Sequence, residues 1–570
     1  MLVDGREVER DASIGCDVCI VGGGPAGLIA ANELLNRDLR VVVLESGGFE
    51  ADPATQMLSD CELEENDDLY PNPRYAHDRR VGGTAEQWDV VIGSRRHVHL
   101  TPLDPLDLRG RDWLPHSRWP IDHATLQPYL ARAQAACESG VLVDEPQACA
   151  DAAHQPFRIP RLESKVLTAC PRDFFQKALP QRLVARRHVT LMTWCNAVEV
   201  KVSQDARQAT AVAVACLNGN RFRVTARTII LAQGAFEVPR LLLNSCSTMA
   251  EGLGNRAGLV GRFLMDRQIV RVGRLLPSRD RGLRSFGFYD MRAVNGGHVL
   301  GKLTLSERVL ESERLLSSLI SFSPRLRFSL LQLLQRPFGR PTTARSPAYR
   351  SARHLRDALR SRRIPADFLH HLGQVAGGLD DLLDIKVLRR AALQPRYNFD
   401  SLGWFDLPDR DRRFPALDVH QMCEQSAHPD NRITLGDPLD ATGMPVARVA
   451  FRWNELDIDS IARTQCILKE ALESAGLGEL VLARRDGYPV LAQMSAHHPS
   501  GTTRMSDDPR AGVVDGQCRV HGVENLFVAS SSVFPSSGSA PPTLTILALA
   551  IRVADRVKSE MDRPLVATTG

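Results

Sequence analysis

The chain of 570 residues is too long for a single hydrophobic core, so two domains are expected. Its hydrophobic content of 43% and charged content of 24% are those of an ordinary globular protein, which excludes a disordered or fibrous chain. The 71 basic and 67 acidic residues leave a formal net charge of +4, so the total charge does not indicate a nucleic acid as partner.

The N-terminal segment and the cysteines lead to an expectation about location. Residues 1–18 lack the basic and apolar regions of a signal peptide, and no apolar run of the sequence reaches membrane-spanning length. The 12 cysteines are scattered, and several lie in apolar runs, as buried reduced thiols do. We therefore expect a cytoplasmic protein without a metal site or membrane contact.

The first predicted element is a strand, a glycine turn and a helix. The strand covers Asp17–Val21, the helix covers Pro25–Leu35, and the glycines between them have the spacing G-x-G-x-x-G. The first glycine permits the tight turn, the second lets backbone N–H groups approach a pyrophosphate, and the third lets helix and strand pack closely. Glu45 ends the next apolar run, and its carboxylate suits ribose hydroxyls but repels the extra phosphate of NADP. The pattern therefore predicts that FAD or NAD binds here.

The next segments are less regular. Residues 51–80 are acidic and polar, and we expect a surface loop there. The sequence VGGTAEQW at 81–88 places two glycines ahead of an aromatic, which suits backbone lying against a ligand ring. Asp122 is a good N-cap for a helix that runs to about Cys137, and the region Glu145–Pro180 looks irregular.

The middle of the chain changes to predicted β-hairpins between Val189 and Leu231. Alternating apolar residues flank the turn signal Asn218-Gly219-Asn220. A second strand–glycine–helix junction follows, with Gly234 after an apolar strand and Pro239 in the first turns of the helix. We expect this junction to close over the same dinucleotide from another side.

Five motifs in order make the chain similar to the glucose-methanol-choline (GMC) oxidoreductase family. They are GGGPAGL with Glu45, VGGTAEQW, TIILAQGAFEVPRLLL, HHPSGTTRM and the tail from VHGVENLFVAS to the last predicted helix. The likeness is greatest to the branch with bacterial fructose and gluconate dehydrogenases and fungal pyranose oxidase. It implies FAD as cofactor and an α/β fold with a Rossmann-like FAD-binding domain of discontinuous segments and a substrate domain with an antiparallel sheet.

The resemblance also implies domain boundaries and cofactor contacts. We expect the FAD-binding domain at 1–115, 185–265 and 494–570, and the substrate domain at 116–184 and 266–493. The implied cofactor contacts are Gly22, Gly24, Pro25, Ala26, Gly27, Glu45, Ser46, Val81, Gly82, Gly83, Thr84, Gln87, Trp88, Val198, Ala232, Gly234, Ala529, Ser530, Pro542 and Thr543.

The resemblance assigns the catalytic residues by position. In HHPSGTTRM the family's base is His498, which would take the hydroxyl proton while a hydride moves to flavin N5. Its neighbour His497 is a further candidate. The family's second active-site histidine or asparagine is replaced by Pro541, which has neither a side-chain donor nor an N–H.

Further departures concern the cofactor and the substrate domain. Gln87 stands where pyranose oxidase has the histidine that bonds covalently to FAD, so we expect dissociable FAD. Ser530 occupies a place often held by aspartate, and Arg267 one where histidine is frequent. Residues 315–390 combine apolar residues at helical spacing with many arginines, which predicts a basic helical insertion that forms a lid over the substrate pocket or contacts a membrane surface or a partner subunit.

Three functions stay open at this point. The first is oxidation of a CH–OH group of a sugar, polyol or natural-product alcohol. The second, which Pro541 favours and His498 disfavours, is another reaction on the same scaffold, such as desaturation or decarboxylation. The third is an electron-relay or assembly subunit that binds flavin. If the first function holds, an electron-acceptor subunit or a quinone is a candidate partner.

Overall fold

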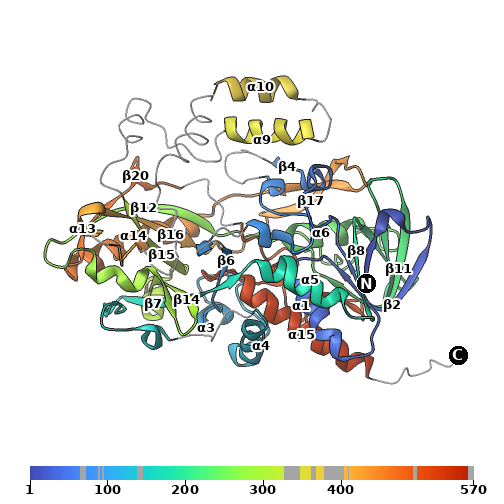
Figure 1. Cartoon of the computed structure of the whole chain (residues 1–570), viewed down its shortest axis with the longest axis horizontal. Coiled ribbons are helices and arrows are strands. Elements are labelled where there is room, and N and C mark those ends of the chain that lie inside the picture. The colour runs from blue at the N-terminus through green and yellow to red at the C-terminus, as the bar shows by residue number, and fades with distance from the viewer. Residues whose placement is uncertain are drawn as a thin grey trace.

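The computed structural model describes residues 1–64, 72–87, 90–92, 95–137, 145–325, 347–360, 367–377, 404–407, 410–491 and 497–562. Two large β-sheets and one three-stranded sheet organise this part of the chain (Figure 1). The fold is a mixed α/β fold, as the sequence predicted.

The first large sheet has eight strands and is mainly parallel. Its central strand β3 is buried along its whole length, in the run VVVL, because helices cover a parallel sheet on both faces. The last two strands, β10 and β9, are antiparallel and form the predicted hairpins. In sheet order the strands are β1 (Leu2–Asp4), β8 (Val189–Thr193), β3 (Val41–Leu44), β2 (Ser13–Val21), β11 (Arg221–Leu231), β10 (Ala209–Ala215) and β9 (Asn196–Val202), with β22 (Leu526–Val528) beside β11.

Helices from both ends of the chain cover this sheet. Helix α1 (Pro25–Glu33) packs on α15 (Thr543–Met561), and α15 packs on α4 (His123–Ala136) (Figure 1). Asp122 caps α4 as predicted, accepting the Thr125 N–H. Helix α5 (Leu179–Val184) packs on α1 and β8, and α6 (Gly234–Asn244) packs on β9.

The second large sheet has nine strands, and all its pairs are antiparallel. Residues of α14 (Glu455–Ser474) form a second core with residues of its strands. In sheet order the strands are β19 (Gly478–Leu482), β12 (Gln268–Pro277), β16 (Ala416–Cys423), β15 (Ser318–Arg325), β14 (Gly297–Leu305), β7 (Leu162–Pro171), β6 (Arg95–Leu100) and β5 (Val90–Ile92), with β13 (Met291–Val294) beside β14.

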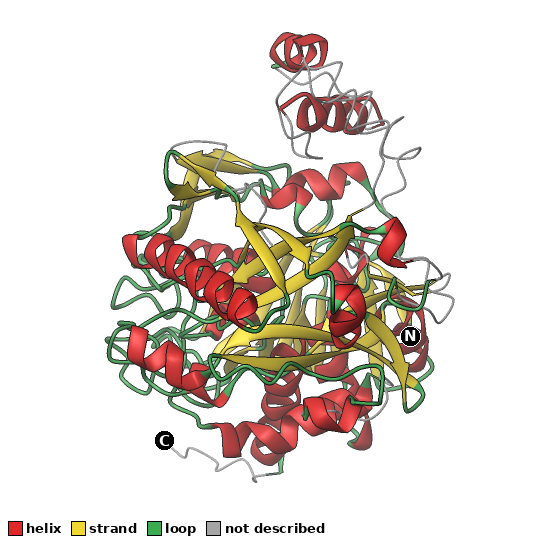
Figure 2. Cartoon of the chain, turned by 90° about the vertical axis from the view of Figure 1, so that its left-hand side faces the viewer, coloured by secondary structure: helices red, strands yellow, loops and turns green. Residues whose placement is uncertain are grey.

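Smaller elements complete the described structure. A three-stranded sheet joins β17 (Arg432–Leu439), β18 (Pro445–Ala450) and β4 (Cys61–Glu64), and β20 (Arg484–Arg485) pairs with β21 (Tyr488–Pro489). Helices α9 (Pro347–Arg360) and α10 (Phe368–Gly377) lie side by side at the periphery of the molecule (Figures 1 and 2). The short helices are α2 (Pro53–Gln56), α3 (Pro105–Leu108), α7 (Glu307–Glu313) and α13 (Arg410–Arg413).

Three sequence-based expectations were wrong. Residues 145–180 are irregular only in their first part, because from Leu162 to Pro171 the strand β7 pairs with β6 and β14. Residues 51–64 are not a surface loop, since they include α2 and β4 with Thr55 and Ser59 buried. Residues 318–325 are not helical, because alternate side chains of β15 are buried in the second sheet, a period of two that the helical interpretation missed.

The predicted division into domains stays a prediction. Strands β5 and β6, which we expected with the FAD-binding segments 1–115, hydrogen-bond into the nine-stranded sheet. Among the described helices, none combines the length and the apolar character needed to cross a membrane.

Candidate active site

The carboxyl ends of strands β2, β3 and β11 open onto one large cavity. Val21 and Leu44, the last residues of β2 and β3, line it, and so does Ala232, which follows β11. Its empty volume is about 1630 Å³, counting the part that is open to solvent. Ligands of open α/β sheets bind at this edge, where loops between strands and helices carry the functional groups.

Two glycine turns meet at one wall of this cavity. A Cβ on Gly27 would lie 1.9 Å from a carbonyl oxygen of the first turn, so only glycine lets α1 pack this closely. Gly83 has a φ of +54°, and a Cβ there would lie 2.9 Å from the Cα of Gly24. The N–H of Gly82 donates to the carbonyl of Gly23 at 2.9 Å, which ties the two turns together.

Most of the predicted residues of these turns line the cavity. They are Gly22, Gly24, Pro25, Ala26, Gly83, Thr84 and Gln87. The lining does not include Gly27, Val81 and Gly82. The two glycines shape the turns, because a Cβ on either would crowd neighbouring backbone. The side-chain amide of Gln87 donates to Asp78 at 2.7 Å. Trp88 lies outside the described residues.

Backbone donors hold the carboxylate of Glu45, which also lines the cavity. Its Oε2 accepts the N–H of Gly23 at 2.8 Å, and its Oε1 accepts the N–H of Gly47 at 3.0 Å. The hydroxyl of Ser46 donates to Oε1 at 3.2 Å. Burial raises the pKa of Glu45, and the hydrogen bonds oppose that shift. Because a carboxylate has about four acceptor positions, Glu45 keeps capacity for ribose hydroxyls.

The second strand–glycine–helix junction lines another part of the same cavity. Ala232 and Gly234 are both in the lining, and α6 begins at Gly234. The predicted contact Val198 is instead buried in the core of the first sheet. Its neighbours Asn196 and Ala197, at the start of β9, line the cavity.

A chain of ion pairs in the lining was not predicted. Arg79 pairs with Glu237 at 2.6 Å, and Arg240 pairs with Glu237 at 3.4 Å and with Asp440 at 2.5 Å. All four residues line the cavity, and they fix the turn between β17 and β18 against α6. The spacing of Glu237 and Arg240 at i and i+3 on a predicted helix was the only sequence signal for this chain. Nearby, burial lowers the pKa of His77 to about 4.

The C-terminal part of the chain closes the other end of the cavity. Ala529 and Ser530 follow β22, Pro542 and Thr543 begin α15, and all four line the cavity. The hydroxyl of Ser530 accepts the N–H of Ser532 at 3.1 Å. Since the N-terminus of a helix carries a partial positive charge, this end of the cavity favours negative charge.

Two adjacent histidines line this end. The backbone N–H of His498 donates to Oδ1 of Asp266 at 2.8 Å, and Nη1 of Arg267 lies 3.5 Å from its Nδ1. His497 has a φ of +57°, so the chain turns sharply between the two side chains. Burial, Arg267 and His497 together hold the pKa of His498 well below its usual value. The imidazole of His498 is therefore neutral at physiological pH.

Arg267 is fixed by the loop that precedes α15. Its Nε donates to the carbonyl of Gly538 at 2.8 Å, and its Nη2 donates to the carbonyl of Ser537. Although burial lowers the pKa of Arg267 to about 10, the side chain stays charged at neutral pH. Pro541 is buried at the end of this loop and is not in the lining.

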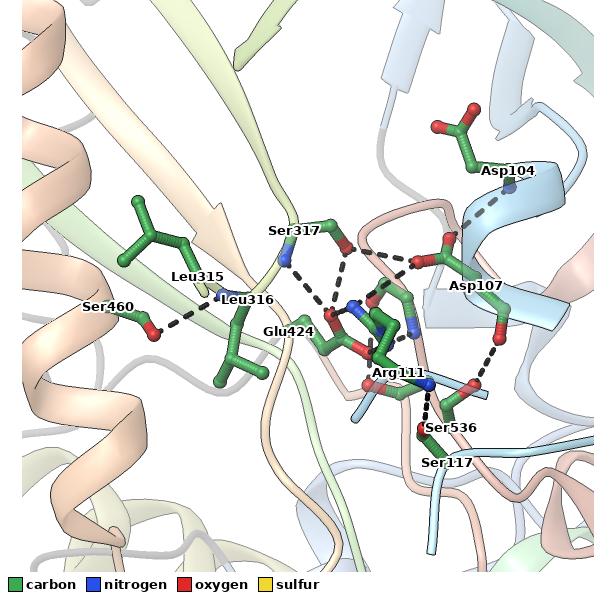
Figure 3. A network of polar contacts seen from close by, with 12 residues as sticks. Asp104, Asp107, Arg111, Ser117, Leu315, Leu316, Ser317, Glu424, Ser460 and Ser536 are labelled. Carbon is green, nitrogen blue, oxygen red and sulfur yellow. Dashed lines mark hydrogen bonds and ion pairs between the residues drawn. The ribbon is translucent and has the colours of Figure 1, made fainter. Parts of the chain in front are cut away.

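A buried ion pair braces the same loop (Figure 3). Arg111 donates to both carboxylate oxygens of Glu424, at 2.8 and 2.5 Å, and the two side chains are only 1% and 0% exposed. Glu424 also accepts the N–H of Gly538 at 3.2 Å. Burial and the charge of Glu424 raise the pKa of Asp107, which lies beside this pair, to about 7. Two distant segments, around Arg111 and around Glu424, thus set the position of the loop that holds Arg267.

Comparisons with known proteins agree with this arrangement. Two family models described as GMC oxidoreductase match residues 172–268 and 427–550, and a model described as FAD binding domain matches residues 15–51.

The chain belongs to the GMC oxidoreductase family.

Relatives of this GMC oxidoreductase span nearly the whole chain. Paromamine 6'-oxidase of Streptomyces fradiae is 24% identical over 98% of this chain and 94% of its own length. The large subunit of fructose dehydrogenase from Gluconobacter japonicus is 25% identical over 64% of this chain and 54% of its own length. A fungal aryl-alcohol oxidase structure covers 97% of this chain and 100% of its own, with a TM-score of 0.51 and 17% identity, which shows a common fold.

The cofactor of this GMC oxidoreductase is FAD, and the cavity suits it. A Cβ on Gly24 would meet nothing nearer than the Cα of Gly83 at 3.9 Å, so the missing side chain leaves room inside the cavity. The glycine turns and the N-terminus of α1 would hold the pyrophosphate, and Glu45 the ribose. The enzyme is an FAD-dependent oxidoreductase that acts on CH–OH donors.

Proposed function

We propose that this GMC oxidoreductase oxidises a CH–OH group of a sugar, polyol or natural-product alcohol, with His498 taking the hydroxyl proton. When bound, FAD supplies the hydride acceptor for such a reaction. The proposal rests on one observation: a neutral imidazole lines the cavity where α15 begins. A ring that is neutral across the physiological pH range is ready to receive a proton. The names of two relatives, a paromamine oxidase and a fructose dehydrogenase, support this class of donors.

Arg267 sets the protonation of this ring. A guanidinium carries donors only and repels a second positive charge, so its contact at 3.5 Å disfavours the imidazolium form of His498. The proton taken from a substrate would leave the ring readily, which returns His498 to its neutral form for the next turnover. Arg267 is buried and acts through His498, so we propose it as a positioning residue.

The same contact also fits a second role of His498. If Nδ1 accepts from the guanidinium, the neutral ring carries its proton on Nε2, where it would donate to the substrate oxygen instead of taking the proton of the substrate. The variant His498→Gln separates the two roles, because glutamine keeps an N–H donor but lacks the basicity of an imidazole. A base role predicts that His498→Gln is as slow as His498→Ala, whereas partial recovery would replace the base role by a donor role.

Pro541 favours a second candidate function, namely a reaction other than alcohol oxidation, such as desaturation or decarboxylation. Without the usual histidine or asparagine, one hydrogen bond to the substrate hydroxyl is lost. Losing a bond to a charged group costs roughly 1.5–3 kcal/mol, so alcohol oxidation would be slower by about ten- to a hundredfold without being abolished.

Anaerobic mixing of the purified protein with a panel of sugars, polyols and amino-alcohols tests the proposal. We expect at least one alcohol to bleach the flavin absorbance. Bleaching only by a non-alcohol or on illumination would support the second candidate. A flavin that is reduced only after a partner protein is added would instead support a role in electron relay, with an acceptor subunit or a quinone as partner.

A further inference from the structure

Helices α9 and α10 bring two histidines and a carboxylate together, far along the chain from His498. His354 lies in α9, Asp367 directly precedes α10, and His371 lies in α10. One ligand atom from each of the three lies within 4.8 Å of the others. We propose that this cluster binds a divalent transition metal ion, and that Zn²⁺ is the ion that fits it best.

The distances suit a tetrahedral ion after a small adjustment. Nε2 of His371 lies 2.8 Å from Oδ2 of Asp367, and Nε2 of His354 lies 3.9 Å from Oδ1 of the same carboxylate. Ligand atoms of a tetrahedral Zn²⁺ with bonds of about 2.0–2.1 Å lie roughly 3.3–3.4 Å apart. One observed distance is shorter than this value and the other is longer, and they run to different oxygens of the carboxylate, so the three side chains must adjust to place one ligand atom each around one ion.

The donor set selects the class of metal. Two imidazole nitrogens and one carboxylate oxygen suit Zn²⁺ and other first-row transition ions, whereas Ca²⁺ and Mg²⁺ prefer oxygen ligands alone. Three protein ligands leave a fourth position for water. The carboxylate is about half exposed, at 56%, while the two imidazoles are 19% and 17% exposed, so an ion can enter from the solvent side.

A neighbouring hydroxyl orients one of the rings. Oγ of Ser351, a buried residue of α9, lies 3.0 Å from Nδ1 of His371. Metal-binding histidines are usually held in this way through the ring nitrogen that does not bind the ion. The rings of His354 and His371 lie with centroids 4.2 Å apart at 33°, so both can face the same ion.

A metal ion here would add a further link between two helices that lie side by side. Leu359 of α9 is 70% exposed, and Leu369 of α10 is 80% exposed, so these side chains add little to a shared core. Because a metal site contributes its binding free energy to folding, the ion would stabilise the pair of helices. Helix α9 also contacts α2, and Leu58 and Ser59, shortly after α2, line the FAD cavity. This inference does not depend on the proposed function.

Zn²⁺ titration of the full-length, FAD-loaded protein tests the proposal. The protein is first freed of metal with a chelator and then titrated by calorimetry. We expect one site in the wild type, a loss of affinity of at least a hundredfold in His354→Ala and His371→Ala, and a loss of about 10–100-fold in Ser351→Ala. His370→Ala is the matched control, because His370 is an exposed histidine on the same helix outside the cluster.

The outcomes separate this site from adventitious binding and from misfolding. Circular dichroism and the flavin spectrum of each variant show whether the protein is still folded. Co²⁺ in place of Zn²⁺ gives visible ligand-field bands, which should be present in the wild type and in His370→Ala and absent in His371→Ala. Wild-type protein that binds no Zn²⁺, or that binds it as tightly after His371→Ala, would overturn the proposal.

Discussion

The two ends of the cavity are built in different ways. At the glycine end, the walls are backbone, and the contacts depend on the absence of side chains at Gly24, Gly27 and Gly83. At the histidine end, a neutral imidazole lies next to a buried guanidinium, and charged side chains from distant segments fix their positions. We propose that the first end determines whether FAD binds, and that the second determines what the bound FAD can do. Substitutions should therefore separate cofactor binding from catalysis.

Gly27→Ala should have the largest effect, because it acts on the glycine end. Its Cβ would lie 1.9 Å from a backbone oxygen, which α1 can relieve only by moving away from the turn. We expect purified Gly27→Ala to lose its FAD, measured as the ratio of flavin to protein absorbance. Gly15→Ala is the matched control on β2, since its Cβ would meet only Thr225 Oγ1 at an ordinary 3.6 Å. Retention of FAD by Gly27→Ala would contradict the role of this turn.

His498→Ala should leave FAD bound and slow its reduction by alcohol. General base catalysis contributes about 10²- to 10⁴-fold, and we expect a loss of that size in the anaerobic reduction rate. The comparison between the two ends fails if this variant loses FAD as Gly27→Ala does. An unchanged reduction rate would remove His498 from the mechanism.

Glu424→Gln should destabilise the fold at the histidine end. It leaves the guanidinium of Arg111 buried without its main partner, and breaking a buried pair costs about 3–5 kcal/mol. Denaturant unfolding measures this loss in the free energy of unfolding. Asp508→Asn is the control, because its partner Arg510 is 88% exposed and surface pairs contribute less than about 1 kcal/mol. Equal effects of the two changes would contradict the importance of the buried network.

Asp107→Asn should have the smallest effect, visible as a change in pH dependence. The carboxyl of Asp107 has a pKa of about 7 in the folded chain against 3.8 for an ordinary aspartate. Between these two pH values, the folded state keeps a proton on Asp107 that the unfolded state has lost. The stabilisation from this proton is therefore complete below pH 3.8 and is lost as the pH rises to about 7. Asparagine should flatten the fall in unfolding free energy between about pH 4 and 7. An unchanged slope would show that another group titrates there.

Local patterns explain what could be predicted from the sequence. The turn around Gly22 and its acid Glu45 lie within one βαβ unit, and the structure places both at the cavity as predicted. Val198, predicted as a cofactor contact, lies in the core, while Asn196 and Ala197 line the cavity, because the residues of β9 that reach the cavity depend on the elements packed around the strand.

Long-range contacts explain what could not be predicted. Arg111 and Glu424 are 313 residues apart, and neither lies in a recognisable motif. The sequence showed that Arg267 departs from the family, but not that it lies beside His498. That contact forms only when the loop before α15 accepts the guanidinium.

The pH dependence of anaerobic flavin reduction at saturating alcohol, compared between the wild type and Arg267→Gln, tests the central claim most directly. Because burial and Arg267 hold the pKa of His498 well below its usual value, the wild-type rate should stay level through the range around pH 6.5 in which an ordinary histidine titrates. Removing the guanidinium should raise that pKa in part, because burial remains as its larger cause, so the rate of Arg267→Gln should begin to fall at a higher pH than the wild-type rate. A wild-type rate that already falls with a pKa near 6.5, unchanged in Arg267→Gln, would contradict the account.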